Sequence, residues 1–389
     1  MYMTGVFRDD ANMNSPKEAE SLGRGDPTGD EYFPRRNPDF SRTITMAQIA
    51  KAAGVSQGAI SSLLNDRDYG IRVSEKTRER VFKVCREMGY LPNDLRAVVR
   101  MYPELGEFCL LLAADLGAAA GDPAIARIAS AAVEAVPGEA RSLTLARYDS
   151  SIDYAVHAEE LPLPVRVGVA SKYLSFGHVN HSLIQSITKR GLPFVLLGAS
   201  LAQAGVISIH PDYPMASQLA IEHLGKLGHK RIAIVSGPFG TTEAAIIELN
   251  RGVRLAFEKM GMAMEAQHVV YGDLTFDAGV AAADMLLERS PAPTAIFCMS
   301  DAVAAGVIAR AVARGTKVPG QLSVIGCGDD PICRLTLPAL TTVHLPYEEM
   351  ASRGIAEIDR LIRFPGLPES KQVTIPVRLV ERHSTAAVS

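Results

Sequence analysis

The segment Thr45–Asn65, TMAQIAKAAGVSQGAISSLLN, constrains the fold of this chain more than any other. Thr45 and Gln48 have the spacing of a capping box at the start of a first helix. Gly54 can adopt the positive φ of a sharp turn at little cost, and Ser56 can cap a second helix. We therefore expect two short helices around a tight turn, the arrangement of a helix-turn-helix that enters DNA; an ordinary helical hairpin is the alternative.

Both predicted helices have one apolar face and one face left for solvent or a partner. The apolar residues, which we expect to be buried, are Ile49, Ala50, Ala53, Val55, Ile60, Leu63 and Leu64. The residues left outward on the second helix are Gln57, Gly58, Ser61, Ser62 and Asn65. They are mostly small or polar, and they begin in the N-terminal half of the helix, where a recognition helix meets base edges.

A third helix is predicted between Ser74 and the GYLPND sequence that begins at Gly89. Its apolar side consists of Val81, Val84, Cys85 and Met88. Residues 42–100 contain eleven Lys or Arg against six Asp or Glu, so the segment is net positive by five although the whole chain has a net charge of −3. A local basic surplus favours phosphate contact, and a solvated charged face is the alternative.

The block from Thr45 to Tyr102 resembles the headpiece of LacI/GalR-type bacterial transcriptional regulators. The resemblance is carried by AGVS before the second helix, by VSEKTRERV after a variable loop, and by GYLPN before the place where that family has a hinge helix. It implies a homodimer in which each headpiece reads a half-site in the major groove. Paired hinge helices would then insert a side chain into the central minor groove.

The resemblance also implies which residues contact DNA. Gln57, Gly58 and Ser62 fall on the main base-reading positions, and Val99 falls on the minor-groove wedge, where the family usually has leucine. Gln57 can pair with adenine, whereas Gly58 offers no side chain. We therefore expect few direct side-chain contacts with bases, and expect DNA shape and backbone contacts to supply the rest of the specificity. The full predicted set is Thr45, Met46, Ser56, Gln57, Gly58, Ala59, Ser61, Ser62, Asn65, Arg72, Ser74, Thr77, Asn93, Arg96 and Val99.

Length and composition divide the chain into four parts. Residues 1–41 hold five basic against eight acidic residues and little apolar periodicity, which predicts a disordered extension. Residues 42–92 are predicted to be the headpiece and 93–105 the hinge helix and linker. Residues 106–389 form the predicted effector-sensing and dimerisation domain. The fold class is thus a small all-α headpiece followed by a two-lobed α/β sensor of the periplasmic-binding-protein type I kind.

From Glu107 onward, short β-rich runs alternate with helical patterns, which is typical of parallel sheets covered on both faces. The strand candidates begin at Phe108 (FCLLLAA), Ser142 (SLTLARY), Val165 (VRVGVAS), Pro193 (PFVLLGA), Val206 (VISIH), Arg231 (RIAIVSG), His268 (HVVYGD), Thr294 (TAIFCMS), Leu322 (LSVIGCG) and Thr341 (TTVHLP). The resemblance to the family's sensor is strongest after His210 and weakest between residues 114 and 190. It implies crossovers between two lobes at residues 208–212 and 329–346, with a ligand cleft between the lobes.

The predicted effector positions lie in loops after strands, where ligands bind in open α/β sheets. They are Asp212, Phe239, Leu249, Phe276, Ser300 and Gly328. Sugar-responsive relatives typically have arginine, asparagine and aspartate where this chain has Leu249, Ser300 and Gly328, so pyranose recognition in the family manner is not expected. Either a different effector binds, one that is less polar or differently oriented, or no effector binds and the lobes keep one arrangement. If the alignment with the family is shifted by one or two residues near Leu249, Glu248 or Arg251 would reach the cleft instead.

Other chemistry is not indicated. Asp329 and Asp330 are expected to make turn and cap hydrogen bonds rather than to form a catalytic pair. His229 is expected to cap a helix C-terminus. No nucleophile elbow, phosphate loop or paired-histidine motif occurs, and no cofactor or metal site is predicted. The five cysteines show no metal-ligand pairing, and neither a membrane span nor an export signal is evident.

These observations predict a cytoplasmic, homodimeric transcriptional regulator that is not an enzyme. It would act as a repressor on a pseudopalindromic double-stranded operator, with a small-molecule, carbohydrate-related effector coupling lobe closure to hinge order. The alternative is a solute-binding or sugar-binding protein whose N-terminal helices do not bind DNA specifically.

Overall fold

The computed structural model describes residues 44–65, 73–88, 90, 107–113, 123–136, 142–168, 170–241, 243–363 and 370–388. Several predictions concern residues outside these ranges. They are the extension 1–41, the hinge segment 93–105 and four predicted DNA contacts, Arg72, Asn93, Arg96 and Val99.

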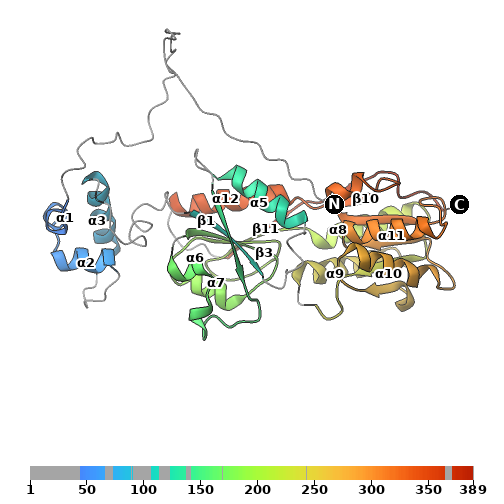
Figure 1. Ribbon diagram of the computed structural model, residues 1–389, viewed down its shortest axis with the longest axis horizontal. Coiled ribbons are helices and arrows are strands. Elements are labelled where there is room, and N and C mark those ends of the chain that lie inside the picture. Colours follow the sequence, from blue (N-terminus) through green and yellow to red (C-terminus); the bar gives the residue numbers. More distant parts are fainter. Residues whose placement is uncertain are drawn as a thin grey trace, which may run out of the picture. The chain divides into compact units, whose positions relative to one another are not determined.

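The N-terminal described part contains three helices, α1 (Met46–Ala53), α2 (Gln57–Asn65) and α3 (Glu75–Met88), and α1 contacts both others (Figure 1). The predicted turn is confirmed, because Gly54 has φ +63° and the Val55 N–H donates to the Ala50 carbonyl over 3.0 Å. Almost fully buried side chains from all three helices form the core: Ile49, Ile60, Leu64, Val81 and Cys85. The helix-turn-helix therefore has most of the apolar core that its sequence predicts, although Val55 and Leu63 are only partly buried.

Two of these helices begin at serine caps. The Ser56 Oγ accepts a hydrogen bond from the Ala59 N–H at 3.2 Å, and the Ser74 Oγ accepts one from the Thr77 N–H at 3.3 Å. Such caps satisfy N–H groups that have no partner within the helix. Both serines therefore serve the start of a helix, as predicted from the sequence.

The remainder of the described chain is built on two six-stranded sheets (Figure 1). The elements of the first sheet and its helices are β1 (Glu107–Ala113), α5 (Pro123–Ala135), β2 (Leu143–Tyr148), α6 (Leu163–Val167), β3 (Ala170–Phe176), α7 (His181–Thr188), β4 (Phe194–Leu197), β5 (Ile207–Pro211), α12 (Tyr347–Arg363) and β11 (Lys371–Ile375), with a 3₁₀ turn at Ala158–Glu160. The strand order is β11-β5-β4-β3-β1-β2, and neighbouring strands are parallel.

The second sheet has the order β12-β10-β9-β8-β6-β7. Its elements are α8 (Tyr213–Lys226), β6 (Ile232–Ser236), α9 (Ala244–Lys259), β7 (Val269–Tyr271), α10 (Phe276–Leu287), β8 (Ala295–Cys298), α11 (Asp301–Ala313), β9 (Ser323–Gly328), β10 (Thr341–His344) and β12 (Arg378–Val380), with 3₁₀ turns at Ala266–His268 and Pro331–Arg334. Its strands are parallel except for β12, which pairs antiparallel with β10.

Each sheet carries apolar cores on both faces. In the first sheet, α5 and α12 pack on one face and α6 and α7 on the other. In the second sheet, α8 and α9 pack on one face and α10 and α11 on the other. Strands that are buried on both sides read as continuous apolar runs, which is why most strand candidates could be recognised.

The chain passes between the two sheets three times in the described part. The first two crossovers, at Asp212 and at residues 345–346, fall within the predicted ranges. The third lies at residues 376–377, between β11 and β12, and was not predicted. These two edge strands are short and partly exposed, so they lack the apolar run that marks the central strands.

The strand candidate at Val165 is wrong over its first four residues. Residues Leu163–Val167 form α6, and the strand begins only at Ala170. Pro164 lies in the first helical turn, where its fixed φ is favourable, and Gly168 ends the helix with φ +73°. Alternation of apolar residues was therefore outweighed by proline and glycine at the two ends of one short helix.

Every helix among the described residues is too short or too polar to span a bilayer.

Candidate nucleic-acid interface and ligand site

The outward face of α2 carries the three main predicted base-reading positions, Gln57, Gly58 and Ser62. Gln57 and Gly58, in its first turn, are exposed, while Ser61 and Ser62 are partly exposed. Ala59 differs, because its side chain is buried in the three-helix core. The exposed surface near the start of α2 therefore offers one long polar side chain, Gln57, beside a patch that has no side chain at Gly58.

Basic side chains lie on the neighbouring helices. Lys51 of α1 and four residues of α3, namely Lys76, Arg78, Arg80 and Lys83, are exposed. Among the remaining predicted contacts, Thr45 is exposed before α1, Met46 is partly exposed, and Asn65 is the last residue of α2. Exposed cations on a small helical unit with a polar reading helix are suited to phosphate and base contacts together.

The predicted ligand positions of the sensor are only partly brought together. Phe239, Phe276, Ser300 and Gly328 follow or end the neighbouring strands β6, β7, β8 and β9, so they lie along the same edge of the second sheet. Carboxyl ends of parallel strands meet at one edge, which is where ligands bind in such folds. Phe239 is 82 % exposed, and its ring meets the Tyr271 ring edge-on with centroids 5.1 Å apart.

Leu249 does not belong to that edge. It is 2 % exposed and lies in the apolar core formed by α8, α9 and the sheet, where its carbonyl accepts from the Ser217 hydroxyl at 2.8 Å. The two neighbours that could have replaced it, Glu248 and Arg251, form an ion pair at 2.9 Å on α9. Leu249 therefore has a packing role, because its side chain is enclosed by hydrophobic neighbours.

Asp212 and Ser300 act as helix caps. The Asp212 carboxylate accepts from the Met215 N–H at 3.0 Å at the start of α8. The Ser300 Oγ accepts from the Ala302 N–H at 3.2 Å at the start of α11. A cap satisfies the orphan N–H groups of a helix, so each side chain already has a structural partner in this arrangement.

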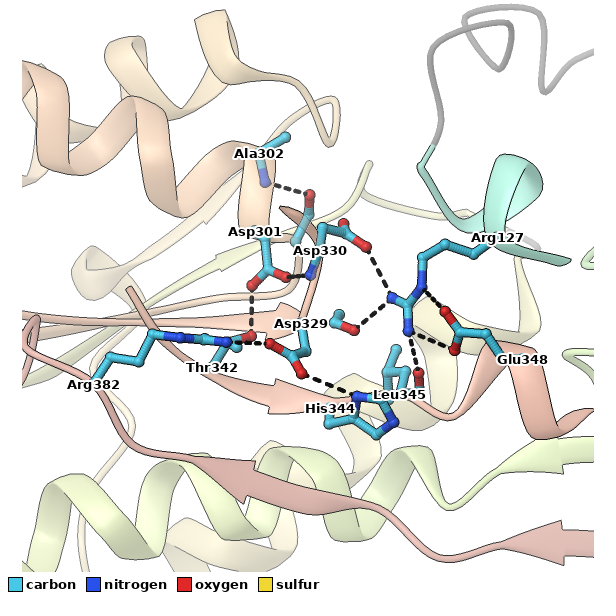
Figure 2. A network of polar contacts seen from close by, with 12 residues as sticks. Arg127, Asp301, Ala302, Asp329, Asp330, Thr342, His344, Leu345, Glu348 and Arg382 are labelled. Carbon is cyan, nitrogen blue, oxygen red and sulfur yellow. Dashed lines mark hydrogen bonds and ion pairs between the residues drawn. The ribbon is translucent and has the colours of Figure 1, made fainter. Parts of the chain in front are cut away.

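Asp301 is the buried centre of a polar network (Figure 2). Its side chain is fully buried, and its two oxygens accept from the Thr342 hydroxyl at 2.5 Å and from the Asp330 N–H at 2.8 Å. Burial raises the pKa of this carboxyl, although these hydrogen bonds act in the opposite direction. The network ties α11 to the turn after β9 and to β10.

Asp329 and Asp330 diverge, as predicted for turn residues. Asp329, with φ +60°, accepts from Arg382 Nη2 at 2.5 Å and pairs with His344 Nδ1 at 3.1 Å. Burial alone would raise the pKa of Asp329, but the Arg382 and His344 contacts outweigh it and the pKa is lowered. Asp330 instead meets Arg127 at 3.1 Å, so each carboxylate has its own cation (Figure 2).

Arg127, from α5, is a site residue that the sequence analysis did not identify. Its guanidinium donates to both Glu348 oxygens at 2.6 and 2.9 Å, to Asp330 Oδ1 at 3.1 Å, and to the Gly328 and Leu345 carbonyls at 2.9 and 3.2 Å. In the sequence, the one indication of this role is that Arg127 is the single cation within the apolar helix sequence PAIARIASAAVEA. This helix lies in the part of the chain where the family resemblance is weakest.

His229 caps a helix through its main chain only. Its N–H donates to the Leu224 carbonyl at 3.1 Å, as the prediction implied. The side chain, however, is buried and connects distant segments, because Nδ1 contacts the Thr294 hydroxyl at 2.9 Å and Nε2 contacts Ser323 at 2.9 Å and the Ala386 carbonyl at 3.1 Å. The expectation of a cap is therefore correct for the backbone and incomplete for the imidazole.

Comparison with known proteins gives two family matches. Residues 45–93 match the domain described as bacterial regulatory proteins, lacI family, and residues 221–385 match a periplasmic binding protein-like domain. The first match covers the three-helix unit with its exposed polar helix, and the second covers all strands of the second sheet together with α12 and β11 of the first.

Similar proteins extend over nearly the whole chain. The HTH-type transcriptional regulator DegA of Bacillus subtilis is 30 % identical over 353 residues, which are 89 % of this chain and 99 % of that protein. The HTH-type transcriptional regulator CelR of Thermobifida fusca is 30 % identical over 87 % of this chain and 96 % of that protein. The solved structure of a CelR–cellobiose complex has a TM-score of 0.62 at 27 % identity, covering 88 % of this chain and 99 % of that one.

Proposed function

Because this chain belongs to the lacI family of bacterial regulatory proteins, we propose that it represses transcription as a homodimer bound to a pseudopalindromic operator. The observation that carries the proposal is the outward face of α2. Gln57 is exposed at the start of a helix that Ser56 caps and an apolar core supports, and α1 and α3 of the same three-helix unit carry exposed cations. Phosphate contacts would position the headpiece, and Gln57 would supply direct base readout.

The proposed organisation follows the sequence. Residues 42–92 form the DNA-binding headpiece, 93–105 the hinge, and 106–389 the sensor and dimerisation domain. The proposed DNA contacts are those predicted above, except that Ala59, being buried, contributes to the core instead. A regulator of chromosomal operators works in the cytoplasm, and the relatives above are transcriptional regulators rather than enzymes.

The proposed effector region is the edge of the second sheet that carries Phe239, Phe276, Ser300 and Gly328. Exposed aromatic rings there are suited to stacking against a ligand with an apolar face. The solved structure of a similar regulator is a CelR–cellobiose complex, which supports a carbohydrate-related ligand class. Leu249 is left out of the proposed contacts because it is enclosed in the core.

The test is genome-wide capture of DNA fragments on the purified full-length protein at about physiological salt, where non-specific electrostatic binding is weakened. Recovery of one pseudopalindromic sequence is the expected result. Gln57→Glu places a carboxylate on the reading face and should abolish that enrichment. Gln185→Glu, which makes the same change at an exposed position of α7, should retain it. Equal recovery of all sequences by the wild-type protein would refute the proposal.

A further inference from the structure

Arg127 joins parts of the molecule that belong to different sheets (Figure 2). It lies on α5, which packs with α12 on the first sheet. Two of its acceptors, the Gly328 carbonyl and the Asp330 carboxylate, lie at the end of β9 and in the turn after it, in the second sheet. A third acceptor, the Leu345 carbonyl, lies on the crossover between them. Each sheet with its covering helices forms one lobe, so this one guanidinium bridges the two lobes.

Arg127 makes an unusually large number of polar contacts for one side chain, and it makes them where it is mostly buried. Arg127 is only 13 % exposed, as is Asp330, and its guanidinium lies 5.0 Å from the centre of the Tyr347 ring. The Glu348 carboxylate binds it through both oxygens. Charge-assisted and bidentate hydrogen bonds are the stronger kinds, and they become stronger where water is partly excluded.

The acceptors have separate roles because of where they lie. Glu348 and Tyr347 begin α12, which packs on the same sheet as α5, so their contacts orient the guanidinium within the first lobe. Gly328 and Asp330 belong to the second lobe, so only their contacts resist movement of one lobe against the other. Glu348 is thus a positioning residue, and Asp330 is the charged partner across the lobes.

Three polar groups at this edge of the second sheet already have partners within the chain. The Gly328 carbonyl and the Asp330 carboxylate are bound by Arg127. The Ser300 hydroxyl caps α11. A cation of the chain itself therefore occupies acceptors at the edge of the second sheet where the proposed effector region lies.

We propose that Arg127 is an internal latch, which holds the two lobes in one arrangement without a bound ligand and which an effector must displace in order to act. The inference rests on the proposed function only for the location of the effector region. The latch is formed by residues of this chain alone, so it can be tested without added ligand and without DNA.

The experiment measures the distance between the lobes by electron–electron double resonance. Spin labels are placed at Gln185→Cys on α7 and Glu258→Cys on α9, both exposed, in the full-length protein diluted with unlabelled subunits. The five natural cysteines are all buried, so the introduced thiols are labelled preferentially. The distance distribution is compared between the wild type and Arg127→Met, which keeps an apolar stem and removes every donor.

We expect one narrow distance for the wild type and a second population in Arg127→Met that amounts to at least about a tenth of the molecules. The matched control is Arg310→Met. Arg310 also pairs with a carboxylate, Asp284, at 2.8 Å, but both residues lie on helices of the second sheet. The control should keep the wild-type distribution.

An unchanged distribution in Arg127→Met would overturn the latch, and so would an equal change in both variants, since that would indicate general loosening. If Arg127→Met fails to fold, Asp330→Ala is measured instead, because it removes the carboxylate acceptor of Arg127, and it should produce the second population by itself. Failure of the wild type to bind an operator would refute the proposed function while leaving this measurement intact.

Discussion

Gly328 and Asp301 approach so closely that a Cβ on residue 328 would lie 2.8 Å from Oδ2 of Asp301. Gly328 also has φ +142°, a conformation that residues with a side chain rarely adopt. The absence of a side chain at the end of β9 is therefore required by the buried network beneath it. Gly328 therefore has a structural role in this turn, in addition to lacking a side chain that could bind an effector.

Gly328→Asp, which would restore the carboxylate expected in sugar-responsive relatives, should destabilise the protein by at least about 2 kcal/mol through backbone strain and overpacking. The added charge would also lie beside Asp301 and Asp330. The measurement is the urea midpoint by circular dichroism. Gly240→Asp is the control, because Gly240 also has positive φ but open space around it, and it should lose about 1 kcal/mol. Equal losses in the two variants would contradict the prediction.

Stability is expected to fall as the pH is lowered below about 6.5, in part because of His229. Burial lowers the pKa of His229 below its ordinary value of 6.5, although the hydrogen bond to Ala386 opposes this. The folded state therefore favours the neutral imidazole. Its contribution is complete above the unfolded pKa and decreases as the pH falls from there toward the folded pKa. Burial also lowers the pKa of His223, which acts in the same direction.

The measurement for this pH effect is the urea midpoint between pH 7.5 and pH 5.5. His229→Gln can keep a hydrogen bond near Nε2 but cannot titrate, so it should be less stable at pH 7.5 by about 1–3 kcal/mol and should lose less on acidification. An acid dependence as steep as that of the wild type would show that His229 is not involved.

Gln57→Ala should weaken binding to the captured operator by about 1–3 kcal/mol while leaving binding to unrelated DNA nearly unchanged. The reason is that Gln57 is the longest exposed polar side chain on the outward face of α2, whereas the basic residues of α1 and α3 supply sequence-independent affinity. Titrations of the operator duplex and of an unrelated duplex at one salt concentration measure the ratio of the two dissociation constants. Gln185→Ala serves as the control. Parallel loss on both duplexes would argue against base readout by Gln57.

Ser56→Ala should lower the stability of the three-helix unit by about 1 kcal/mol, because the Ala59 N–H loses its cap. Aspartate also caps helices well, so Ser56→Asp should retain most of the stability of the three-helix unit. Hydrogen exchange of the α2 amides reads this unit separately from the sensor. Equal protection in the wild type and Ser56→Ala would mean that the cap contributes nothing measurable.

Much of the fold could be predicted because its determinants are local. Gly54 and Ser56 specify the turn and the start of α2 within a few residues, and the central strands are marked by runs such as IAIV and AIFC that are buried on both sides. The failures occurred where local signals are weak or conflict. The edge strands β11 and β12 are partly exposed, and the residues around Val165 combine an apolar alternation with helix-favouring ends.

The roles of the sensor residues depend on tertiary packing. The sequence places Leu249 at a ligand position, but which face of α9 enters the core depends on how α8 packs against it. His229 was recognisable beside a helix end, yet its imidazole partners lie 65, 94 and 157 positions away. Spacing in sequence carries no information about such partners.

By itself the sequence determined the helix-turn-helix, the two-lobed α/β class and the family, because hydrophobic periodicity, caps and turn residues act over a few neighbouring positions. Only the tertiary structure decided that Arg127 meets Gly328, 201 positions away, and that Asp301 leaves no room for a side chain there. Those contacts depend on how two separately wound sheets bring their helices and strand ends together. A charge on an apolar helix acquires its role only when that packing supplies its partners.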